Sequence, residues 1–415
     1  MSIAPWNFPR AELLPTYAFV ASDAVKAKVR AQGADLIDLG LGNPDQATPA
    51  SIVSRLQEAA EIGKNHRYHP GRGFADLRLA HCEWYKRRYG VDFDPDRHVM
   101  VTMGAKDGMT GLCLAILGQG DHVLSPDPAY PIHAGAPLIA GAEVHTYPVE
   151  APDQAAVIGQ RLRELAASGR RVKLVILNYP HNPTGRIVSA QELKAIVEVV
   201  RDSGALLLHD MAYADLDFQN RNSPSVFDCG LPFAEVERFA VEAFSLSKSY
   251  HMPGWRIAFM VGSPAMIAAL AHLKTYTDYG TFAPLQVAAA WALRNGDAIV
   301  DEIREMYRSR ARALVQGLRR AGWTEAQEPT GTMFVWTRLP RALAHLDSFS
   351  ATAYLIENAH VAVSPGSGFG PAGEGFVRFA LIEDPPRIQE ACDRIGRVLA
   401  RLEEKARPSA APAAP

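Results

Sequence analysis

Short, strongly apolar runs alternate with amphipathic stretches through the middle of the chain, and this alternation restricts the fold more than any other feature. The run VKLVILN at 172–178 is followed by SAQELKAIVEVVRDSG at 189–204, which has helical spacing, a serine at its start and a glycine at its end. A second apolar run, ALLLHD, comes next at 205–210. Strands of a parallel sheet that is covered on both faces read as nearly continuous apolar runs. The pattern therefore predicts an α/β fold in which helices sandwich a mostly parallel sheet.

The pattern changes after Gly296. A long, charged, amphipathic segment at 297–320 precedes the apolar runs MFVWTRL and FVRFALI, and a last helix is expected near 385–405. This order indicates a smaller α+β domain, and the N-terminal arm is expected to pack against it. The divisions that we expect are an arm with part of the small domain at 1–45, a large domain at 46–295, a small domain at 296–407 and a disordered tail, rich in Ala and Pro, at 408–415.

The charge and the cysteines exclude several classes of protein. The formal net charge is −2, so the composition does not favour binding to nucleic acid or to an anionic membrane. The four cysteines are scattered without a CxxC pair, and the histidines show no HExxH spacing, so we expect neither a disulfide framework nor a metal site. No stretch reads as a signal peptide or as a membrane span. We therefore expect a reduced, cytoplasmic protein.

Sheets of this kind bind ligands at the carboxyl ends of their strands, so polar residues there are candidates for a site. The stretch TMGAKDG at 102–108 is a glycine turn that opens a helix, and its free N–H groups suit a phosphate. Tyr130 follows two prolines that stiffen its loop, and its ring could stack on a flat ligand. Asn182, between a strand end and a proline, can offer its amide to a ligand oxygen. Each of these features, taken alone, also fits an ordinary turn.

Two charged residues interrupt apolar runs. Asp210 closes ALLLHD, where a carboxylate without a partner would be costly. It could pair with a protonated ring nitrogen, and Tyr213 could reach the same ligand. Arg378 interrupts FVRFALI, and its guanidinium would suit a carboxylate. The structural alternatives are a helix cap or an ion pair for Asp210 and an internal ion pair for Arg378.

Lys248 lies in SLSKSYHMPGWR, between two apolar runs, although lysine is rarely buried without a partner. Ser245, Ser247 and Arg256 can supply two hydroxyls and a bidentate guanidinium to a phosphate. A lysine amine can also form a Schiff base with a carbonyl. Pyridoxal 5'-phosphate combines a phosphate, a flat ring, a ring nitrogen, a phenolic oxygen and an aldehyde. The joint occurrence of these groups at strand ends therefore predicts an enzyme that uses this cofactor.

These motifs resemble those of the class I/II aminotransferases, which are pyridoxal-phosphate enzymes of fold type I. The resemblance extends from IDLGLGNPD at 37–45 to VRFALIE at 377–383, and SLSKSYHMPGWR is close to the lysine signature of the family. GLGNPD, DYGTFAPLQVAA and VSPGSGFG are most similar to the alanine aminotransferase branch, near the diaminopimelate enzymes. One departure is His251, where the signature usually has asparagine or a small residue.

The resemblance implies roles at the cofactor. Lys248 would carry the cofactor as a Schiff base, Asp210 would pair with the ring nitrogen, and Tyr130 would stack on the ring. The phenolic oxygen would be bound by Tyr213 and Asn182. The phosphate would be held by Ala105, Lys106, Ser245, Ser247 and Arg256. Tyr68 would reach the same phosphate from the partner subunit, which implies a homodimer with shared active sites.

The resemblance also implies the substrates. Arg378 would bind the α-carboxylate, with Gly42 and Asn182 close by. The expected reaction is transamination of an L-amino acid with a 2-oxo acid, most simply alanine with 2-oxoglutarate to give pyruvate and glutamate. Valine, methionine, aromatic amino acids and diaminopimelate stay open as donors, and Lys274 is a candidate to bind a distal carboxylate. A C–S lyase on the same fold and a non-enzymatic regulator are the alternative functions.

Overall fold

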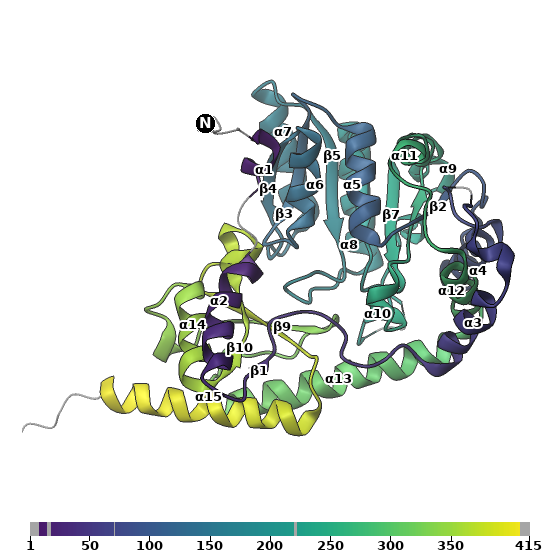
Figure 1. Ribbon diagram of the computed structural model, residues 1–415. Helices are drawn as coiled ribbons and strands as arrows, with labels where there is room; N and C mark the ends of the chain where they lie inside the picture. Colours follow the sequence, from purple (N-terminus) through teal and green to yellow (C-terminus); the bar gives the residue numbers. More distant parts are fainter. Residues whose placement is uncertain (1–7, 15–17, 70, 220–221, 407–415) are drawn as a thin grey trace, which may run out of the picture.

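The computed structural model describes residues 8–14, 18–69, 71–219 and 222–406, so the tail expected at 408–415 lies outside the described residues. Its main element is a seven-stranded sheet with the strand order β2-β8-β7-β6-β5-β3-β4 (Figure 1). The strands of this sheet are β2 (Val99–Thr102), β3 (His122–Asp127), β4 (Glu143–Pro148), β5 (Val172–Asn178), β6 (Leu206–Asp210), β7 (Ala240–Ser245) and β8 (Ala258–Gly262).

The strand directions confirm the mostly parallel sheet. Strands β4, β3, β5, β6 and β7 are parallel to one another, whereas β8 is antiparallel to both β7 and β2. Because β8 runs in the opposite direction, its first residue lies beside the last residue of β7, and Ser245 pairs with Ala258. The residues just before β8 therefore lie at the same edge of the sheet as the carboxyl ends of the parallel strands.

Helices cover both faces of this sheet, as the continuous apolar runs predict. Apolar residues of α5, α6 and α11 pack on one face, and those of α4, α7, α8 and α12 pack on the other. The helices of this part of the chain are α3 (Ala50–Ala60), α4 (Ala75–Tyr89), α5 (Ala105–Ile116), α6 (Ile132–Ala140), α7 (Gln154–Ala167), α8 (Ala190–Ser203), α9 (Phe233–Val236), α10 (Leu246–Ser249), α11 (Pro264–Thr277) and α12 (Ala283–Asn295).

The ends of α8 agree with the residues that predicted them. The Ser189 hydroxyl oxygen accepts a hydrogen bond from the Glu192 N–H at 3.1 Å, which satisfies one of the free donors of the first turn. At the other end, Gly204 has a φ of +73°, a left-handed conformation that glycine adopts at little cost.

A second group of elements follows the sheet and encloses its own apolar core. The predicted helix at 297–320 is α13, which borders a three-stranded sheet with the order β11-β12-β9. Strand β1, from the start of the chain, pairs with β10, and α2 packs on α14. The bounds are α1 (Pro9–Glu12), α2 (Ala18–Ala31), β1 (Ile37–Asp38), α13 (Asp297–Arg320), β9 (Phe334–Arg338), α14 (Ser348–Ala359), β10 (Val361–Ala362), β11 (Ser364–Pro365), β12 (Phe376–Ala380) and α15 (Pro385–Ala406).

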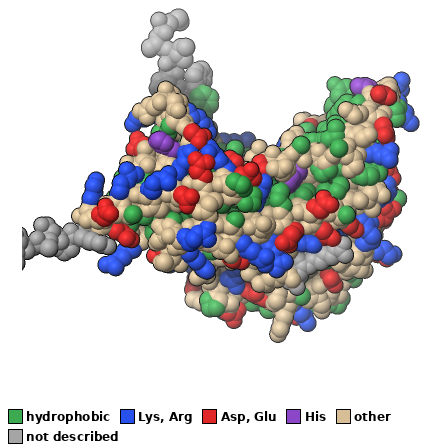
Figure 2. Space-filling view, turned by 90° about the horizontal axis from the view of Figure 1, so that it is seen from below, with side chains coloured by type: hydrophobic (Ala, Val, Ile, Leu, Met, Phe, Trp, Pro, Cys, Tyr) green, Lys and Arg blue, Asp and Glu red, His purple; other side chains and the backbone are tan. Residues whose placement is uncertain are grey.

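The surface carries charges of both signs, with Lys and Arg interspersed among Asp and Glu on the face that Figure 2 shows. Hydrophobic side chains also reach the surface, among them Ile62, Tyr68, Tyr279 and Phe282. The Tyr68 and Tyr279 rings lie 4.7 Å apart. Within the described ranges, no helix combines the length and the apolar character that crossing a membrane requires.

Candidate active site

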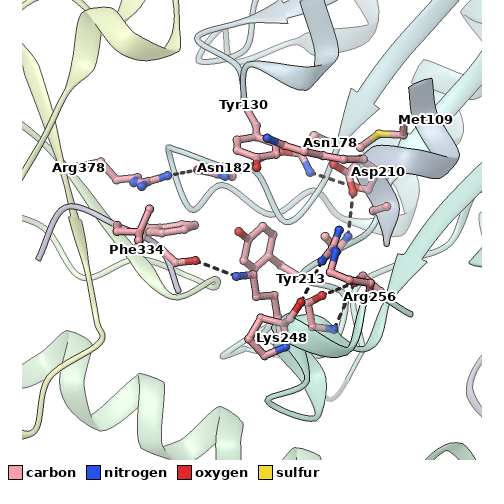
Figure 3. Close-up of a pocket in the computed structure, with 18 residues that line it drawn as sticks. Met109, Tyr130, Asn178, Asn182, Asp210, Tyr213, Lys248, Arg256, Phe334 and Arg378 are labelled. Carbon is pink, nitrogen blue, oxygen red and sulfur yellow. Dashed lines mark hydrogen bonds between the residues drawn. The ribbon is translucent and has the colours of Figure 1, made fainter. Parts of the chain in front are cut away.

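A cavity of about 270 Å³ lies at the carboxyl ends of β5, β6 and β7, between the large sheet and β12 (Figure 3). It brings together every residue proposed for the cofactor or the substrate except Tyr68 and Lys274. Those residues are Gly42, Ala105, Lys106, Tyr130, Asn182, Asp210, Tyr213, Ser245, Ser247, Lys248, Arg256 and Arg378. Leu41, Met109, Asn178, Ala212, Pro253 and Phe334 complete the lining.

Lys248 lies in the four-residue helix α10, which directly follows β7. Its amine donates a hydrogen bond to the Gly42 carbonyl oxygen at 2.8 Å, so the segment after β1 closes over the lysine. Burial, together with the positive charges of Arg378 and Arg256, lowers the pKa of Lys248 to about 7. The amine is therefore largely neutral at slightly alkaline pH, the form that acts as a nucleophile or a base.

A turn suited to an anion lies beside Lys248. Gly104 precedes α5 with a φ of +88°, and any side chain there would collide with the Arg256 guanidinium. The Ser245 and Ser247 hydroxyl oxygens lie 3.0 Å apart, and the Arg256 guanidinium donates to the Pro253 carbonyl oxygen at 3.0 Å. The helix N-terminus, two hydroxyls and one guanidinium thus meet at one end of the cavity, an arrangement that suits a phosphate.

Asp210 ends β6 and is 3% exposed. One of its carboxylate oxygens lies 2.9 Å from His133 Nε2, and the other accepts the Ala212 N–H at 3.0 Å. The Asn178 amide donates to the Asp210 backbone carbonyl oxygen at 2.9 Å. The carboxylate is thereby held at a fixed position in the cavity wall, where it can face a positively charged ring nitrogen.

Arg378 comes from β12 and is 2% exposed. It donates to the Asn182 side-chain oxygen at 2.9 Å and to the Gly40 carbonyl oxygen at 3.0 Å. The centres of the Phe334 and Phe369 rings lie 4.0 Å and 4.6 Å from its guanidinium carbon. The guanidinium is thus fixed in orientation at the end of the cavity opposite Arg256, as a bidentate partner for a carboxylate must be.

The remaining lining residues shape the space between the two arginines. The Lys106 amine lies 5.1 Å from the centre of the Tyr130 ring, and the Tyr213 ring lies 5.6 Å from that of Phe334. A side chain at Gly42 would collide with the Phe334 ring. The glycine therefore allows the backbone of this segment to lie against the Phe334 ring.

Three residues that the sequence singled out lie outside the cavity. The Tyr68 side chain is mostly exposed and contacts Tyr279 instead. His251 is buried, with its ring 5.7 Å from that of Tyr307. Lys274 is not available to a ligand, because its buried amine pairs with Asp107 at 2.8 Å and with Asp278 at 2.6 Å. The suggestion that Lys274 binds a distal carboxylate is therefore wrong for this arrangement.

Three residues that line the cavity or hold its wall were not predicted from the sequence. Asn178 is the last residue of β5, so the rule that drew attention to polar strand ends could have found it. His133 lies in α6 and is far from Asp210 in sequence, and nothing local marks it as a partner of that carboxylate. Phe334 begins β9 inside an apolar run, where its sequence context is that of a core residue.

Known proteins of one family match this chain over most of its length. The family model for aminotransferase class I and II matches residues 34–395. Glutamate-pyruvate aminotransferase AlaC of Escherichia coli is 43% identical over 386 residues, which cover 93% of this chain and 92% of the relative. LL-diaminopimelate aminotransferase of Desulforudis audaxviator is 36% identical over 394 residues, which cover 94% of this chain and 97% of the relative.

Solved structures show the same fold. The structure of substrate-bound BacF from Bacillus subtilis is 30% identical and has a TM-score of 0.87 over 96% of this chain and 98% of that chain. A mutant aspartate aminotransferase of Thermus thermophilus is 27% identical, with a TM-score of 0.85 over 95% of this chain and 100% of that chain. The family model spans most of the chain, and the two relatives are 43% and 36% identical to it. The chain therefore belongs to the class I and II aminotransferases and is an aminotransferase of fold type I.

Proposed function

We propose that the protein is a pyridoxal-phosphate-dependent aminotransferase that transfers the amino group of L-alanine to 2-oxoglutarate. The observation that carries the proposal is the position of the Lys248 amine, between an anion-binding turn and the buried guanidinium of Arg378. An amine at that point can reach the reacting carbon of a ligand whose phosphate lies at one end and whose carboxylate lies at the other.

The residues present fit pyridoxal 5'-phosphate. Gly104 leaves room for Arg256 beside the N-terminus of α5, and the two serine hydroxyls add donors for a phosphate. Asp210, held by His133, offers a negative charge for a pyridinium nitrogen. When bound, the cofactor supplies an aldehyde for the amino group and a protonated ring that accepts electrons from the substrate Cα.

The protein's own residues then bind, orient and move protons. Because burial and two arginines lower the pKa of Lys248, its Nζ can accept the α-proton of the substrate and donate it again. The Asn182 side-chain oxygen accepts from Arg378, so its amide nitrogen is the end that can donate to a ligand oxygen. Tyr213 and Asn182 would bind the phenolic oxygen, and Tyr130 would stack on the ring.

The proposal of alanine rests on the relative named glutamate-pyruvate aminotransferase and on the lining of the cavity. Leu41 and Phe334 present apolar surface near Arg378 and Gly42, which suits a short apolar side chain. The relatives named LL-diaminopimelate aminotransferase support the second candidate, diaminopimelate. Valine, methionine and aromatic amino acids are further candidate donors, ranked after alanine and diaminopimelate.

We also infer that the protein works as a homodimer. Tyr68 is 84% exposed, and Tyr276, Tyr279 and Phe282 expose further aromatic surface. A second copy of the chain that covered this surface could bring its Tyr68 to the phosphate.

We infer three further features from the sequence. They are a large unit at 46–295, a small unit at 296–407 that the arm at 1–45 joins, and a cytoplasmic location.

The half-reaction tests the function directly. Holoenzyme mixed with L-alanine, with no 2-oxo acid present, should release one pyruvate per active site and then stop, because the amino group stays on the cofactor. Addition of 2-oxoglutarate should then give an equal amount of glutamate. The measurement is pyruvate, ammonia and glutamate per site, and Lys248→Ala should release no pyruvate.

Other outcomes separate the alternatives. Ammonia and pyruvate formed from a thioether amino acid in excess of the number of sites would identify a C–S lyase. One equivalent of another 2-oxo acid, formed from another donor, would keep the aminotransferase and replace alanine.

Arg378→Met should raise KM for every amino acid and 2-oxo acid, because all of them share the α-carboxylate. Loss of one partner of a buried charged pair costs on the order of 2–5 kcal/mol, which corresponds to a rise of roughly 30-fold or more. The measurement is KM and kcat for two donors and two acceptors. Arg338→Met is the control, because Arg338 is an exposed arginine of the neighbouring strand β9. A rise limited to one substrate would contradict the role of Arg378.

Mixing two inactive variants tests Tyr68. In a mixed dimer of Lys248→Ala and Tyr68→Ala, one site inherits both defects if each site takes these residues from different chains, and the other site inherits none. Mixing should then restore activity, up to one working site per mixed dimer. Differently tagged subunits report exchange, and each variant incubated alone provides the baseline. If exchange occurs without recovery of activity, Tyr68 serves its own chain.

A further inference from the structure

Three side chains with metal-binding atoms meet at the amino ends of β3 and β4, the edge opposite the catalytic cavity. They are His122 of β3 and Glu143 and His145 of β4. The strands are parallel, with His122 paired to Glu143 and Leu124 paired to His145. Side chains two residues apart on a strand share a face. The register therefore places all three side chains on one face of the sheet.

The distances between the three groups fit the coordination of a metal ion. His145 Nε2 lies 3.2 Å from His122 Nδ1, and His122 Nδ1 lies 3.5 Å from a Glu143 carboxylate oxygen. One potential ligand atom from each residue lies within 4.8 Å of the other two. Ligand atoms around a tetrahedral Zn²⁺ with bonds of about 2.0–2.1 Å are roughly 3.3 Å apart. The cluster needs only small side-chain movements to surround such an ion.

The contact between the two imidazole rings also suits a metal. An imidazole binds a metal through a ring nitrogen that carries no proton. Without a metal, one of the two imidazole nitrogens at 3.2 Å must donate a proton to the other, and a divalent ion would replace that proton.

Nearby positive charges weaken the affinity of the cluster for a metal ion, but the cluster stays accessible to solvent. Arg161 and Arg170 add positive charge near His145, whereas Glu143 supplies a carboxylate. The Glu143 side chain is 63% exposed, so the cluster is open to solvent on its side. Two imidazoles and one carboxylate leave a fourth position for water, which is the ligand set of an open zinc site.

We propose that His122, Glu143 and His145 bind one Zn²⁺ or a similar divalent transition-metal ion, which links the edge strand β4 to β3. No metal site was predicted from the sequence, because metal-binding motifs place their ligands close together along the chain. Here His122 and His145 are separated by 23 residues and meet only through strand pairing. The site lies far from Lys248, so its occupancy should affect stability rather than transamination.

Titration of the holoenzyme with ZnCl2 tests the proposal. After removal of metals with a chelator, calorimetry at 25 °C should show one saturable Zn²⁺ site per chain. Saturation should raise the unfolding temperature and leave kcat with the preferred donor unchanged. His145→Gln and Glu143→Gln should each weaken binding at least tenfold. His272→Gln, which changes an exposed histidine of α11, should bind as the wild type does.

Two controls keep the test decisive. Glu143 is mostly exposed, so Glu143→Gln should fold even if a histidine variant does not. Co²⁺ in place of Zn²⁺ should give visible absorption bands of an ion bound to imidazole, and these bands should be lost in His145→Gln. The proposal is overturned if the wild type shows no saturable site, or if the cluster variants bind Zn²⁺ as the wild type does. The second result would mean that the ion binds elsewhere, for example at the cofactor.

Discussion

An amine enclosed between two guanidinium groups is the constraint on which the rest of the site depends. The Lys248 amine donates to a backbone carbonyl oxygen rather than to a carboxylate, and the positive charges of Arg378 and Arg256 destabilise its ammonium form. This arrangement disfavours the ammonium form, and a purely structural core would gain no stability from it. In the ligand-free site it leaves a neutral amine between two guanidinium groups, each of which can bind an anionic group of a ligand.

The fold produces this arrangement by bringing together segments that are far apart in the sequence. The antiparallel direction of β8 brings Arg256 to the edge where the parallel strands end. Strand β12 of the smaller sheet carries Arg378, and the segment after β1 carries Gly42 over the lysine. The ligand thus spans two groups of elements, and the contact between Arg378 and Asn182 joins them.

Much of this could be predicted from the sequence, because polar residues at the ends of apolar strands are conspicuous. Asp210 and Lys248 stand out against apolar runs that otherwise indicate burial, and Asn182 lies between a strand end and a proline. The packing of Phe334 against Arg378 and the contact of His133 with Asp210 could not be predicted, since they depend on how separate elements pack. The same reason explains Lys274, whose two carboxylate partners come from α5 and from the residue after α11.

The central claim is that the folded chain itself makes Lys248 an unusually weak base, and the ionisation of its amine tests that claim most directly. Cofactor-free protein can be labelled over a range of pH with a small amine-reactive reagent, and the label on the Lys248 peptide can be quantified by mass spectrometry against added N-acetyl-lysine. The structure predicts a midpoint near the pKa of about 7 that burial and the two arginines impose. A midpoint close to that of an ordinary lysine, about 10.4, would contradict the account.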